Sequence, residues 1–524
     1  MTHLCVPIFV TDPNQLTRQS ALAAEAGADM LELRLDHLTK CPDSWPRIDL
    51  PVIVTCRPVW EAGHSMLNDA ARVDLVNRSA QSLDARYMDI ELETYRRISG
   101  RVIPSRALII SSHDTTGRPE RLNNILLEMA DIPAAVNKIA YTARTIRDNF
   151  EIFDVLRQRV RPTIALCMGE AGLISRLLAR KFGAALTFAS LDDSQSTAPG
   201  QPTIGQIKHL YRWDAIRPET KVYGVVAHPV RHSMSPAIHN AAFESVGFDG
   251  VYLPLLVEPS YESFKAFMEV ALSTAGFDLS GLSVTIPHKE NALRYLREKG
   301  ANIEPLAATI GAVNTIVITR REGRDGPVAL AGLNTDYAAI LDSITSALGI
   351  DRAGLSDLKV AVLGAGGTGR TAVAALAACG CRVTIFNRTR QRADALAQEL
   401  GDSRGKSVAA ADWADLANAD CDILINTTSV GMSPHIDQSP LDGHEKLLHR
   451  VRLVFDAVYN PMQTRLLASA QSAKVKTVCG ADMFVRQAAG QFRAFTGIAP
   501  PVDVMRHVLE EHLKPQPPDS AIRA

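Results

Sequence analysis

Two lysines stand at positions where an amine could do chemistry. Lys138 lies in the middle of an apolar run at 135–140, and Lys289 follows a short strand-like run that ends before Pro287. An unpaired ammonium inside an apolar strand is costly, so Lys138 must pair with an anion or lose its proton. A neutral lysine attacks ketones and forms a Schiff base, whereas a charged lysine stabilises the oxygen of a carbonyl that is being reduced.

A histidine and an aspartate stand where they could assist these lysines. His113 closes the apolar run before that of Lys138, where it can serve as a general base or acid. Taken alone, Lys138 could form a buried ion pair and His113 could be structural, but together on neighbouring strand ends they favour chemistry. Asp336, in Gly332-Leu333-Asn334-Thr335-Asp336, could share a proton with Lys289.

A glycine turn follows these residues and indicates a redox cofactor. Gly364-Ala365-Gly366-Gly367 joins the apolar strand 358–363 to a helix, so the backbone can approach a pyrophosphate at a helix N-terminus. The next strand, 382–386, leads into Asn387-Arg388-Thr389-Arg390-Gln391-Arg392, where an NAD site usually has an acidic residue. Guanidinium groups bind a 2′-phosphate, so the sequence predicts NADP.

The first 215 residues contain the elements that would position Lys138. Eight short apolar runs recur at 4–10, 29–35, 51–57, 86–92, 106–112, 135–142, 162–168 and 185–190, with helical spacing between most of them, for example at 15–26 and 67–83. This alternation predicts a closed parallel (β/α)₈ barrel, in which chemistry sits at the C-terminal ends of the strands. Polar residues stand at these ends, namely Glu32, Arg34, Arg57, Glu61, His113, Asp114 and Lys138.

Composition limits the class of protein. The chain has 524 residues, which predicts two to four domains, and a formal net charge of -1, which gives no reason to expect nucleic acid as a partner. No apolar run reaches the roughly 20 residues of a membrane span, and residues 1–10 carry no basic leader. The eight cysteines are scattered, so we expect free thiols in a reducing cytoplasm and no metal site.

The first domain resembles type I 3-dehydroquinate dehydratase. Six short motifs carry the resemblance in order: Glu32-Leu33-Arg34-Leu35-Asp36, Arg57 with Glu61, Ser112-His113-Asp114, Asn137-Lys138-Ile139-Ala140, Ile174-Ser175-Arg176 and Thr197-Ala198-Pro199-Gly200-Gln201. The resemblance implies that Lys138 forms an imine with the C3 ketone of 3-dehydroquinate, that His113 moves the C2 proton and that Glu61 orients His113. It also implies that Arg176 holds the substrate carboxylate and that ring hydroxyls are contacted by Glu32, Arg34, Arg57 and Gln201, with the hydroxyl of Thr197 nearby.

The remaining 300 residues resemble shikimate dehydrogenase, through Val284-Thr285-Ile286-Pro287-His288-Lys289, the run that ends at Asp336 and the glycine turn. The resemblance implies that Lys289 and Asp336 form the catalytic pair for reduction of 3-dehydroshikimate. Substrate-binding positions are then Ser233, Ser235, Thr285, Asn314, Tyr459 and Gln487. Cofactor-binding positions are Gly364, Ala365, Gly366, Gly367, Asn387, Arg388, Thr389 and Arg392, with Thr427 and Met432 on the nicotinamide side. From the residues alone, Ser233 and Ser235 could equally cap a helix.

Together these patterns predict an α/β chain in which a barrel precedes a two-lobed dehydrogenase with a Rossmann-type lobe. The predicted domains are the barrel at 1–215, a substrate lobe at 220–340 that is completed by about 487–513, an NADP lobe at 350–486 and a loose tail at 514–524. The two predicted reactions are consecutive, and their small-molecule substrates are the partners that we expect. A quinate dehydrogenase, or a metabolite-sensing regulator with inactive domains, is the alternative. The pattern indicates no oligomeric state.

Overall fold

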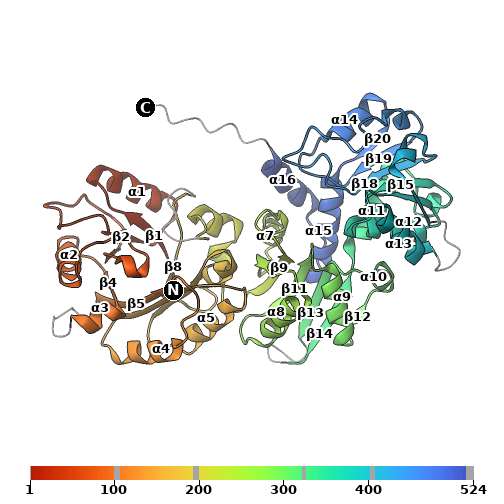
Figure 1. The fold of residues 1–524 in the computed structure, drawn as a ribbon. Helices are drawn as coiled ribbons and strands as arrows, with labels where there is room; N and C mark the ends of the chain where they lie inside the picture. The colour runs from red at the N-terminus through yellow and green to blue at the C-terminus, as the bar shows by residue number, and fades with distance from the viewer. Residues whose placement is uncertain (1, 99–106, 193–199, 321–325, 402–407, 515–524) are drawn as a thin grey trace. The chain divides into compact units, whose positions relative to one another are not determined.

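The computed structural model describes residues 2–98, 107–192, 200–320, 326–401 and 408–514 (Figure 1). The chain divides into two compact units. One unit contains residues up to 224 together with 228–231 and 249–279, and the other contains 225–227, 232–248 and the residues from 280 onward. In the described part of the chain, no helix is long and apolar enough to cross a membrane.

The first unit contains the predicted parallel barrel. Its strands are β1 (His3–Phe9), β2 (Met30–Arg34), β3 (Val52–Thr55), β4 (Tyr87–Glu91), β5 (Leu108–Asp114), β6 (Val136–Thr142), β7 (Thr163–Met168) and β8 (Leu186–Phe188). Their order is β7-β6-β5-β4-β3-β2-β1-β8, and every pair is parallel. Between β7 and β8 the ring is nearly closed, since the Ala185 N–H donates to the Thr163 carbonyl at 2.8 Å. The barrel prediction is confirmed.

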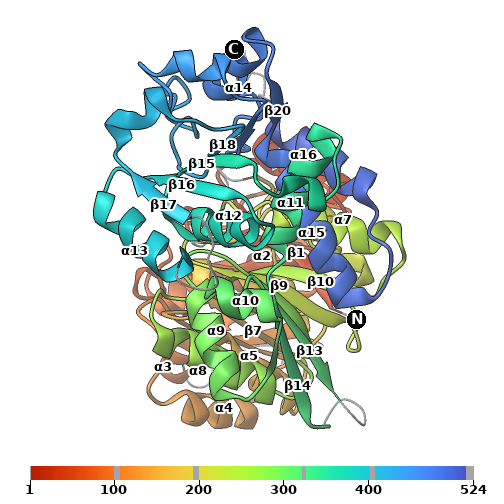
Figure 2. The ribbon, with the colours of Figure 1, turned by 90° about the vertical axis from the view of Figure 1, so that its right-hand side faces the viewer.

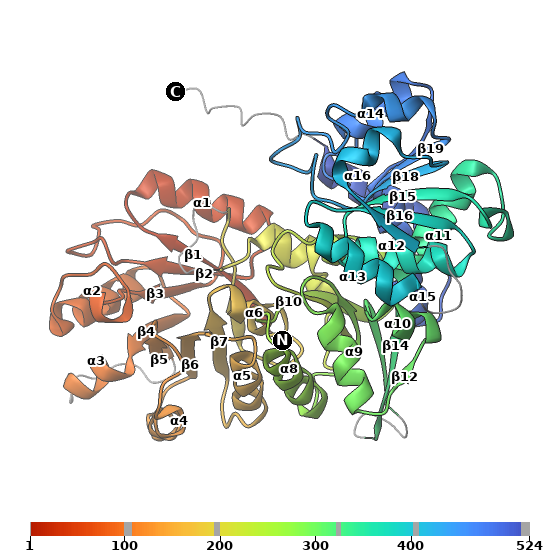
Figure 3. The ribbon, with the colours of Figure 1, turned by 45° about the vertical axis from the view of Figure 1, so that its right-hand side comes forward.

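Helices surround these strands because both faces of the strands are apolar. The helices are α1 (Pro13–Glu25), α2 (Asp69–Ser82), α3 (Leu92–Arg97), α4 (Leu122–Asp131), α5 (Asp148–Arg157) and α6 (Leu173–Leu177), with a short turn η1 (Val59–Glu61). Strands β2, β3 and β7 are buried along their whole length, as expected when helices cover the outside (Figure 3). Helix α1 begins where the Asp12 carboxylate accepts from the backbone N–H groups of Asn14 and Gln15.

The second sheet carries the elements around Lys289. Its strands are β9 (Lys221–Ala227), β10 (Gly250–Leu256), β11 (Leu279–Val284), β12 (Asn302–Ile303), β13 (Thr315–Arg320) and β14 (Val328–Leu333), in the order β10-β9-β11-β13-β14-β12. Strand β13 runs antiparallel to both β11 and β14. The helices that accompany this sheet are α7 (Ser235–Ser245), α8 (Tyr261–Ser273), α9 (Lys289–Glu298), α10 (Pro305–Ile310) and α11 (Thr335–Leu348).

The third sheet has the strand order of a dinucleotide-binding fold. Its strands are β15 (Lys359–Leu363), β16 (Arg382–Phe386), β17 (Val408–Ala411), β18 (Ile423–Asn426), β19 (Leu453–Asp456) and β20 (Lys476–Val478). All are parallel in the order β17-β16-β15-β18-β19-β20, so the chain order reverses beside β15. Ligands of such sheets bind at this reversal, at the carboxyl ends of the strands. The Rossmann-type prediction is confirmed.

Five further helices complete this unit: α12 (Gly367–Ala378), α13 (Arg390–Gly401), α14 (Arg465–Ser472), α15 (Gly480–Thr496) and α16 (Val502–Leu513). Helices α12 and α13 lie along the sheet beside β15, β16 and β17 (Figure 2). Helix α15 returns to β11 and β13 of the second sheet, because Gln491 donates to the Asn314 carbonyl at 3.3 Å and accepts from the Ser283 hydroxyl at 2.8 Å.

Candidate active sites

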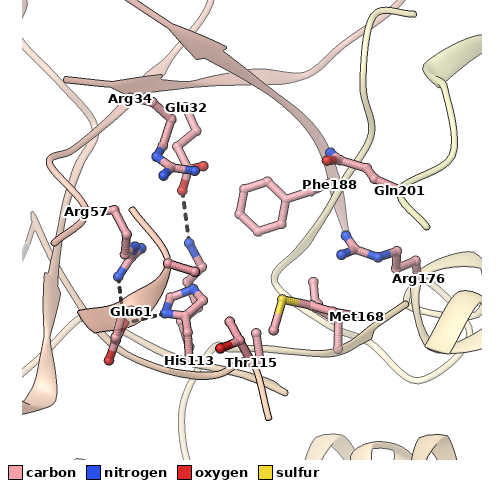
Figure 4. A pocket seen from close by; sticks show the side chains of 14 residues that line it. Glu32, Arg34, Arg57, Glu61, His113, Thr115, Met168, Arg176, Phe188 and Gln201 are labelled. Carbon is pink, nitrogen blue, oxygen red and sulfur yellow. Dashed lines mark hydrogen bonds and ion pairs between the residues drawn. The ribbon is translucent and has the colours of Figure 1, made fainter. Parts of the chain in front are cut away.

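A pocket of about 120 Å³ opens at the C-terminal ends of the barrel strands (Figure 4). Its lining consists of Glu32, Arg34, Arg57, Glu61, Ala62, His113, Thr115, Lys138, Ala140, Leu166, Met168, Arg176, Phe188 and Gln201. Eight residues predicted for the first site are therefore brought together. Thr197 lies outside the described residues.

Lys138 lies inside the barrel and is paired with two carboxylates. Its Nζ donates to Glu32 Oε1 at 2.9 Å and to Asp89 Oδ2 at 2.7 Å, and it lies 4.6 Å from the centre of the Phe188 ring. From the sequence, this amine could either form an ion pair or lose its proton. In the structure it forms the ion pair. A ketone entering the pocket would therefore meet an amine that is held in place by carboxylates on β2 and β4.

Arg57 links several acidic strand ends beneath Lys138. Its guanidinium contacts Asp89 at 3.0 Å, Glu91 at 3.1 Å and Glu61 at 3.2 Å. Burial would raise the pKa of Asp89, but the charges of Arg57 and Lys138 outweigh burial and hold it below its usual range. Burial alone would likewise lower the pKa of Arg57, and Asp89 and Glu91 raise it instead. Arg57 and Asp89 therefore stay ionised.

His113 and Glu61 form a hydrogen-bonded pair at the pocket wall. His113 Nδ1 lies 2.8 Å from Glu61 Oε2. Burial lowers the pKa of His113 well below its ordinary value, and the nearby charges of Arg57 and Lys138 lower it further. Burial also raises the pKa of Glu61 to about 8. The imidazole is thus neutral at physiological pH, which is the form that a general base requires.

Arg176 is a buried cation that forms no ion pair with any described residue. Helix α6 places its guanidinium in the pocket, opposite Arg57 and His113 in the view of Figure 4, with Gln201 beside it. The residue is 2% exposed, its Nε has no hydrogen-bond partner, and no carboxylate of the described residues forms an ion pair with it. Burial lowers its pKa to about 10, so the guanidinium is still charged at neutral pH. Such an unpaired buried charge calls for an anionic ligand.

The sequence analysis missed Asp89, Glu91 and Phe188. Asp89 and Glu91 alternate within the otherwise apolar strand β4, Tyr-Met-Asp-Ile-Glu, and the side chains of both are buried. Two carboxylates at alternate positions of a buried strand point to the same barrel interior as Lys138, so this spacing was the available signal. Phe188 gave no such signal, because an aromatic residue in a barrel strand usually packs in the core.

A second lysine–carboxylate pair lies where the second site was predicted. Lys289 Nζ lies 2.6 Å from Asp336 Oδ2, and both side chains are largely buried. Lys289 begins α9 and Asp336 stands in the first turn of α11, where Asn334 Oδ1 accepts from the Asp336 N–H at 3.1 Å. The N-terminal end of α11 also favours a negative charge at Asp336.

Asn314 is joined to the same turn. Its Oδ1 accepts from the Thr335 N–H at 2.8 Å, and its Nδ2 donates to the Thr335 hydroxyl at 3.0 Å. Thr285 precedes α9, and its carbonyl accepts from the His288 N–H at 2.8 Å. These contacts fix the loops on both sides of the Lys289–Asp336 pair.

The other predicted substrate positions lie in the same unit without a hydrogen bond to that pair among the described residues. Ser235 N–H donates to the Ser233 hydroxyl at 3.3 Å, while Met234 occupies the N-cap of α7 and no side chain caps that helix. Tyr459 packs its ring 4.9 Å from that of Phe484, and burial raises its pKa. Gln487 is buried on α15.

The glycine turn after β15 has the shape that a pyrophosphate needs. Gly364 has a φ of +105°, and a Cβ there would lie 2.8 Å from Thr427 Oγ1. At Gly369 a Cβ would lie 2.2 Å from the Gly364 carbonyl oxygen. Gly366 and Gly367 instead face open space at the start of α12. Ala365 N–H donates to Asn387 Oδ1 at 3.1 Å, which ties the turn to the end of β16.

The end of β16 presents two guanidiniums that are not engaged elsewhere. Arg388 and Arg392 are exposed and form no ion pair with any described residue, and Thr389 is exposed between them. By contrast, Arg390 pairs with Asp394 and Asp412, each at 2.9 Å. These residues fit a 2′-phosphate. After β18, Thr427 Oγ1 donates to the Leu363 carbonyl at 2.7 Å and the side chain of Met432 is exposed.

Family models of known proteins match both the part of the chain that contains Lys138 and the part that contains Lys289. Family models match at residues 4–218 (Type I 3-dehydroquinase), 225–316 (Shikimate dehydrogenase substrate binding domain), 348–461 (Shikimate / quinate 5-dehydrogenase) and 480–510 (Shikimate 5'-dehydrogenase C-terminal domain). A bifunctional 3-dehydroquinate dehydratase/shikimate dehydrogenase of Arabidopsis thaliana, described as chloroplastic, is 38% identical over 97% of this chain and 84% of its own length. The chain belongs to this bifunctional family.

Relatives of the second part alone are also found. The shikimate dehydrogenase (NADP(+)) of Methanothermobacter thermautotrophicus is 40% identical over 56% of this chain and 98% of its own length. A crystal structure of the Thermus thermophilus shikimate 5-dehydrogenase with NADP(H) and shikimate is 33% identical over 56% of this chain and 99% of that chain, with a TM-score of 0.46. The motifs predicted resemblances to type I 3-dehydroquinate dehydratase and to shikimate dehydrogenase, and both are confirmed.

Proposed function

We propose that this chain converts 3-dehydroquinate to shikimate in two steps. The barrel dehydrates 3-dehydroquinate to 3-dehydroshikimate, and the second site reduces that ketone with NADPH. The observation that carries the proposal is the first pocket, in which an amine (Lys138), a neutral imidazole (His113) and an unpaired buried guanidinium (Arg176) face one small cavity. A cyclic keto acid supplies the partner for each of the three.

In the dehydration, Arg176 holds the substrate carboxylate through its planar guanidinium. Lys138 first passes one proton to the Glu32 carboxylate that it contacts. Its neutral Nζ then attacks the C3 ketone, and loss of one water gives the imine. The protonated imine accepts the electron pair that is left when His113 takes the C2 proton. The C1 hydroxyl then departs as water with a proton from His113, and hydrolysis of the imine releases 3-dehydroshikimate and the free lysine. Glu61 orients His113 through the 2.8 Å contact to Nδ1.

The remaining polar groups of the first pocket would bind the ring hydroxyls. We assign this role to Glu32, Arg34, Arg57 and Gln201, with the hydroxyl of Thr197 as a further contact. Glu32 also holds Lys138 before the ketone arrives, so one carboxylate serves both the amine and the substrate.

In the reduction, Lys289 and Asp336 act on the oxygen of the ketone. NADPH, when bound, supplies the hydride. Negative charge then develops on the C3 oxygen, where the Lys289 ammonium stabilises it and delivers the proton. Asp336 holds the ammonium in place at 2.6 Å. We assign the carboxylate of this substrate to Ser233 and Ser235 and its hydroxyls to Thr285, Asn314, Tyr459 and Gln487.

The cofactor would lie along the third sheet. The pyrophosphate fits the turn at Gly364, Ala365, Gly366 and Gly367, where two glycines face open space. The 2′-phosphate fits Asn387, Arg388, Thr389 and Arg392, and Thr427 and Met432 would flank the nicotinamide. We propose domains at 1–215, at 220–340 with 487–513, and at 350–486. Since all eight cysteines are free thiols, we also propose a reducing compartment, the cytoplasm.

Two parallel assays test the proposal. Purified protein is given 3-dehydroquinate and NADPH, and shikimate is the expected product. In parallel, borohydride in the presence of 3-dehydroquinate is expected to add the mass of the reduced substrate to Lys138 in the wild type and not in Lys138→Gln. Shikimate formation without any adduct would exclude the imine mechanism, and an adduct without shikimate would exclude the reductase. Faster oxidation of quinate than of shikimate with NADP⁺ would favour the quinate dehydrogenase alternative.

A further inference from the structure

A groove that the two reactions do not use lies beside α11, α15 and α16. Its volume is about 500 Å³, within the range of small-molecule sites. Its lining consists of Glu304, Leu333, Asn334, Thr335, Tyr337, Ala338, Ala339, Asp342, Arg486, Ala489, Gly490, Arg493, Pro500, Val502 and Arg506. Neither Lys289 nor Asp336 belongs to this lining, so the groove is a separate hollow of the second unit.

Three arginines border the groove, and two of them form no ion pair with a described residue. Arg506 pairs with Asp482 at 2.7 Å. Arg486 and Arg493 stand seven residues apart on α15, which places them on one face of that helix. Both are exposed, and in the described part of the chain neither forms an ion pair or a side-chain hydrogen bond.

The acidic residues of the groove are already engaged. Asp342 pairs with Arg352 at 2.7 Å. Glu304 accepts from the Tyr337 hydroxyl at 2.5 Å and from the Asn334 N–H at 3.1 Å. Two unpaired guanidiniums against one carboxylate without a cationic partner leave one positive charge in excess. A ligand with a single negative charge would balance it.

The rest of the wall is apolar. Leu333, Ala338, Ala489, Pro500 and Val502 supply side chains without hydrogen-bonding groups. Arginine also stacks its planar group on flat hydrophobic ligands, besides binding carboxylates through two parallel hydrogen bonds. We propose that this groove binds a small organic monoanion, a carboxylate attached to an apolar body, at the arginines Arg486 and Arg493.

The groove borders residues that hold the second reaction site in place. Its lining includes Asn334 and Thr335, which hold Asp336 and Asn314 through hydrogen bonds of 3.1 Å and 2.8 Å. A carboxylate probe could also enter the reaction sites themselves. Those sites must therefore be filled first, which rests on the proposed function. 3-Dehydroshikimate with NADP⁺ occupies the second site without reduction, because oxidised cofactor carries no hydride, and the first site is filled by 3-dehydroshikimate in equilibrium with 3-dehydroquinate.

The test is a titration of the full-length protein with benzoate in that filled state, followed by calorimetry. We expect one benzoate per chain with a dissociation constant on the order of 1 mM, as befits so small a ligand. Binding should weaken at least tenfold in the double variant Arg486→Gln, Arg493→Gln. It should stay unchanged in Arg450→Gln, which removes an exposed guanidinium elsewhere in the same unit. Benzamide should fail for lack of charge, and inorganic phosphate for lack of an apolar body.

A second measurement locates the ligand without relying on the variants. Photolysis with 4-azidobenzoate in the filled state should label peptides within 486–506. Absence of benzoate binding to the wild type, equal binding to the double variant, or labelling only outside 486–506 would each overturn the proposal. If shikimate is not formed in the assay above but benzoate still binds and labels 486–506, the groove stands and only the proposed function fails.

Discussion

Asp89 Oδ2 lies 2.7 Å from Lys138 Nζ, and the same oxygen accepts from Arg57 at 3.0 Å. One carboxylate thus lies between two of the buried cations of the first pocket, Lys138 and Arg57. It is supported from below by the Ser111 hydroxyl, which donates to Asp89 Oδ1 at 2.5 Å. The arrangement makes Asp89 a positioning residue for the amine that attacks the ketone.

Asp89→Asn should therefore harm both stability and dehydration. The amide keeps the shape but leaves Arg57 and Lys138 without a shared counter-charge, and breaking a buried ion network costs about 3–5 kcal/mol. Urea dependence of dehydratase activity measures this loss, and kcat should fall at least tenfold. Asp154→Asn is the matched control: its pair with Arg157 is exposed, so we expect a change within about 1 kcal/mol. Equal stability of the two variants would contradict the positioning role.

Replacing Arg176 should increase the stability of the folded protein, whereas Asp89→Asn should decrease it. Burial lowers the pKa of Arg176 to about 10, so at neutral pH the charged form destabilises the folded protein relative to the unfolded chain. Arg176→Met should raise the free energy of unfolding by about 1 kcal/mol or more, because a buried unpaired charge is replaced by an apolar side chain. The same variant should raise KM for 3-dehydroquinate roughly 10–100-fold, through loss of charged hydrogen bonds. A variant that is both less stable and fully active would refute the carboxylate assignment.

The sequence predicted which neighbouring strand ends meet in the first site. It did not predict contacts between residues that lie far apart in the chain. The ends of neighbouring parallel strands meet at one edge, so the apolar runs sufficed to bring His113 and Lys138 together, and their register, with Ser111 opposite Lys138, agrees. The partners of Lys138 did not follow from local pattern. Glu32 and Asp89 lie 106 and 49 residues away, and whether a buried amine pairs or loses its proton depends on such distant carboxylates. That no described carboxylate pairs with Arg176 is likewise a property of the folded pocket only.

Glu61 makes the first site sensitive to pH. Burial raises its pKa from 4.5 to about 8, so the folded protein binds this proton more tightly than the unfolded chain. The stability from this group is complete below about pH 4 and is lost as the pH rises through 8. Glu61→Gln has no such titration. The thermal midpoint of dehydratase unfolding should therefore fall more between pH 6 and pH 9 in the wild type than in Glu61→Gln.

The dehydratase activity should rise with pH, whereas the stability that Glu61 contributes falls. Ionised Glu61 accepts from His113 Nδ1–H and leaves Nε2 free as the base, whereas protonated Glu61 favours the wrong tautomer. The kcat/KM of dehydration should rise with pH up to about 8 and then level, as expected for groups of the free enzyme. Glu61→Gln should lower kcat/KM and remove this inflection. An inflection that persists in the variant would assign it to another group.

Lys289→Gln should separate the two activities of the chain. Removing the ammonium leaves the C3 oxygen without its charge partner and proton donor, so kcat of the reduction should fall about 10²–10⁴-fold. NADPH binding, followed by the fluorescence of the reduced nicotinamide, should change less than twofold, and dehydration should be unaffected. Parallel losses in NADPH binding and kcat would mean that Lys289 is structural.

Three arginines lie within five residues after β16, at the proposed cofactor site, and they differ in their ion pairs. Arg388 and Arg392 carry no ion pair among the described residues, whereas Arg390 is held by Asp394 and Asp412. The sequence could not separate them, because Asp412 lies beyond the next helix. The double variant Arg388→Gln, Arg392→Gln should lower kcat/KM for NADPH roughly 10–100-fold, since charged hydrogen bonds to the 2′-phosphate are lost, and leave that for NADH within twofold. Arg390→Gln should change neither, because its charge already serves two carboxylates. A wild type that prefers NADH, or a larger loss in Arg390→Gln than in the double variant, would contradict this assignment.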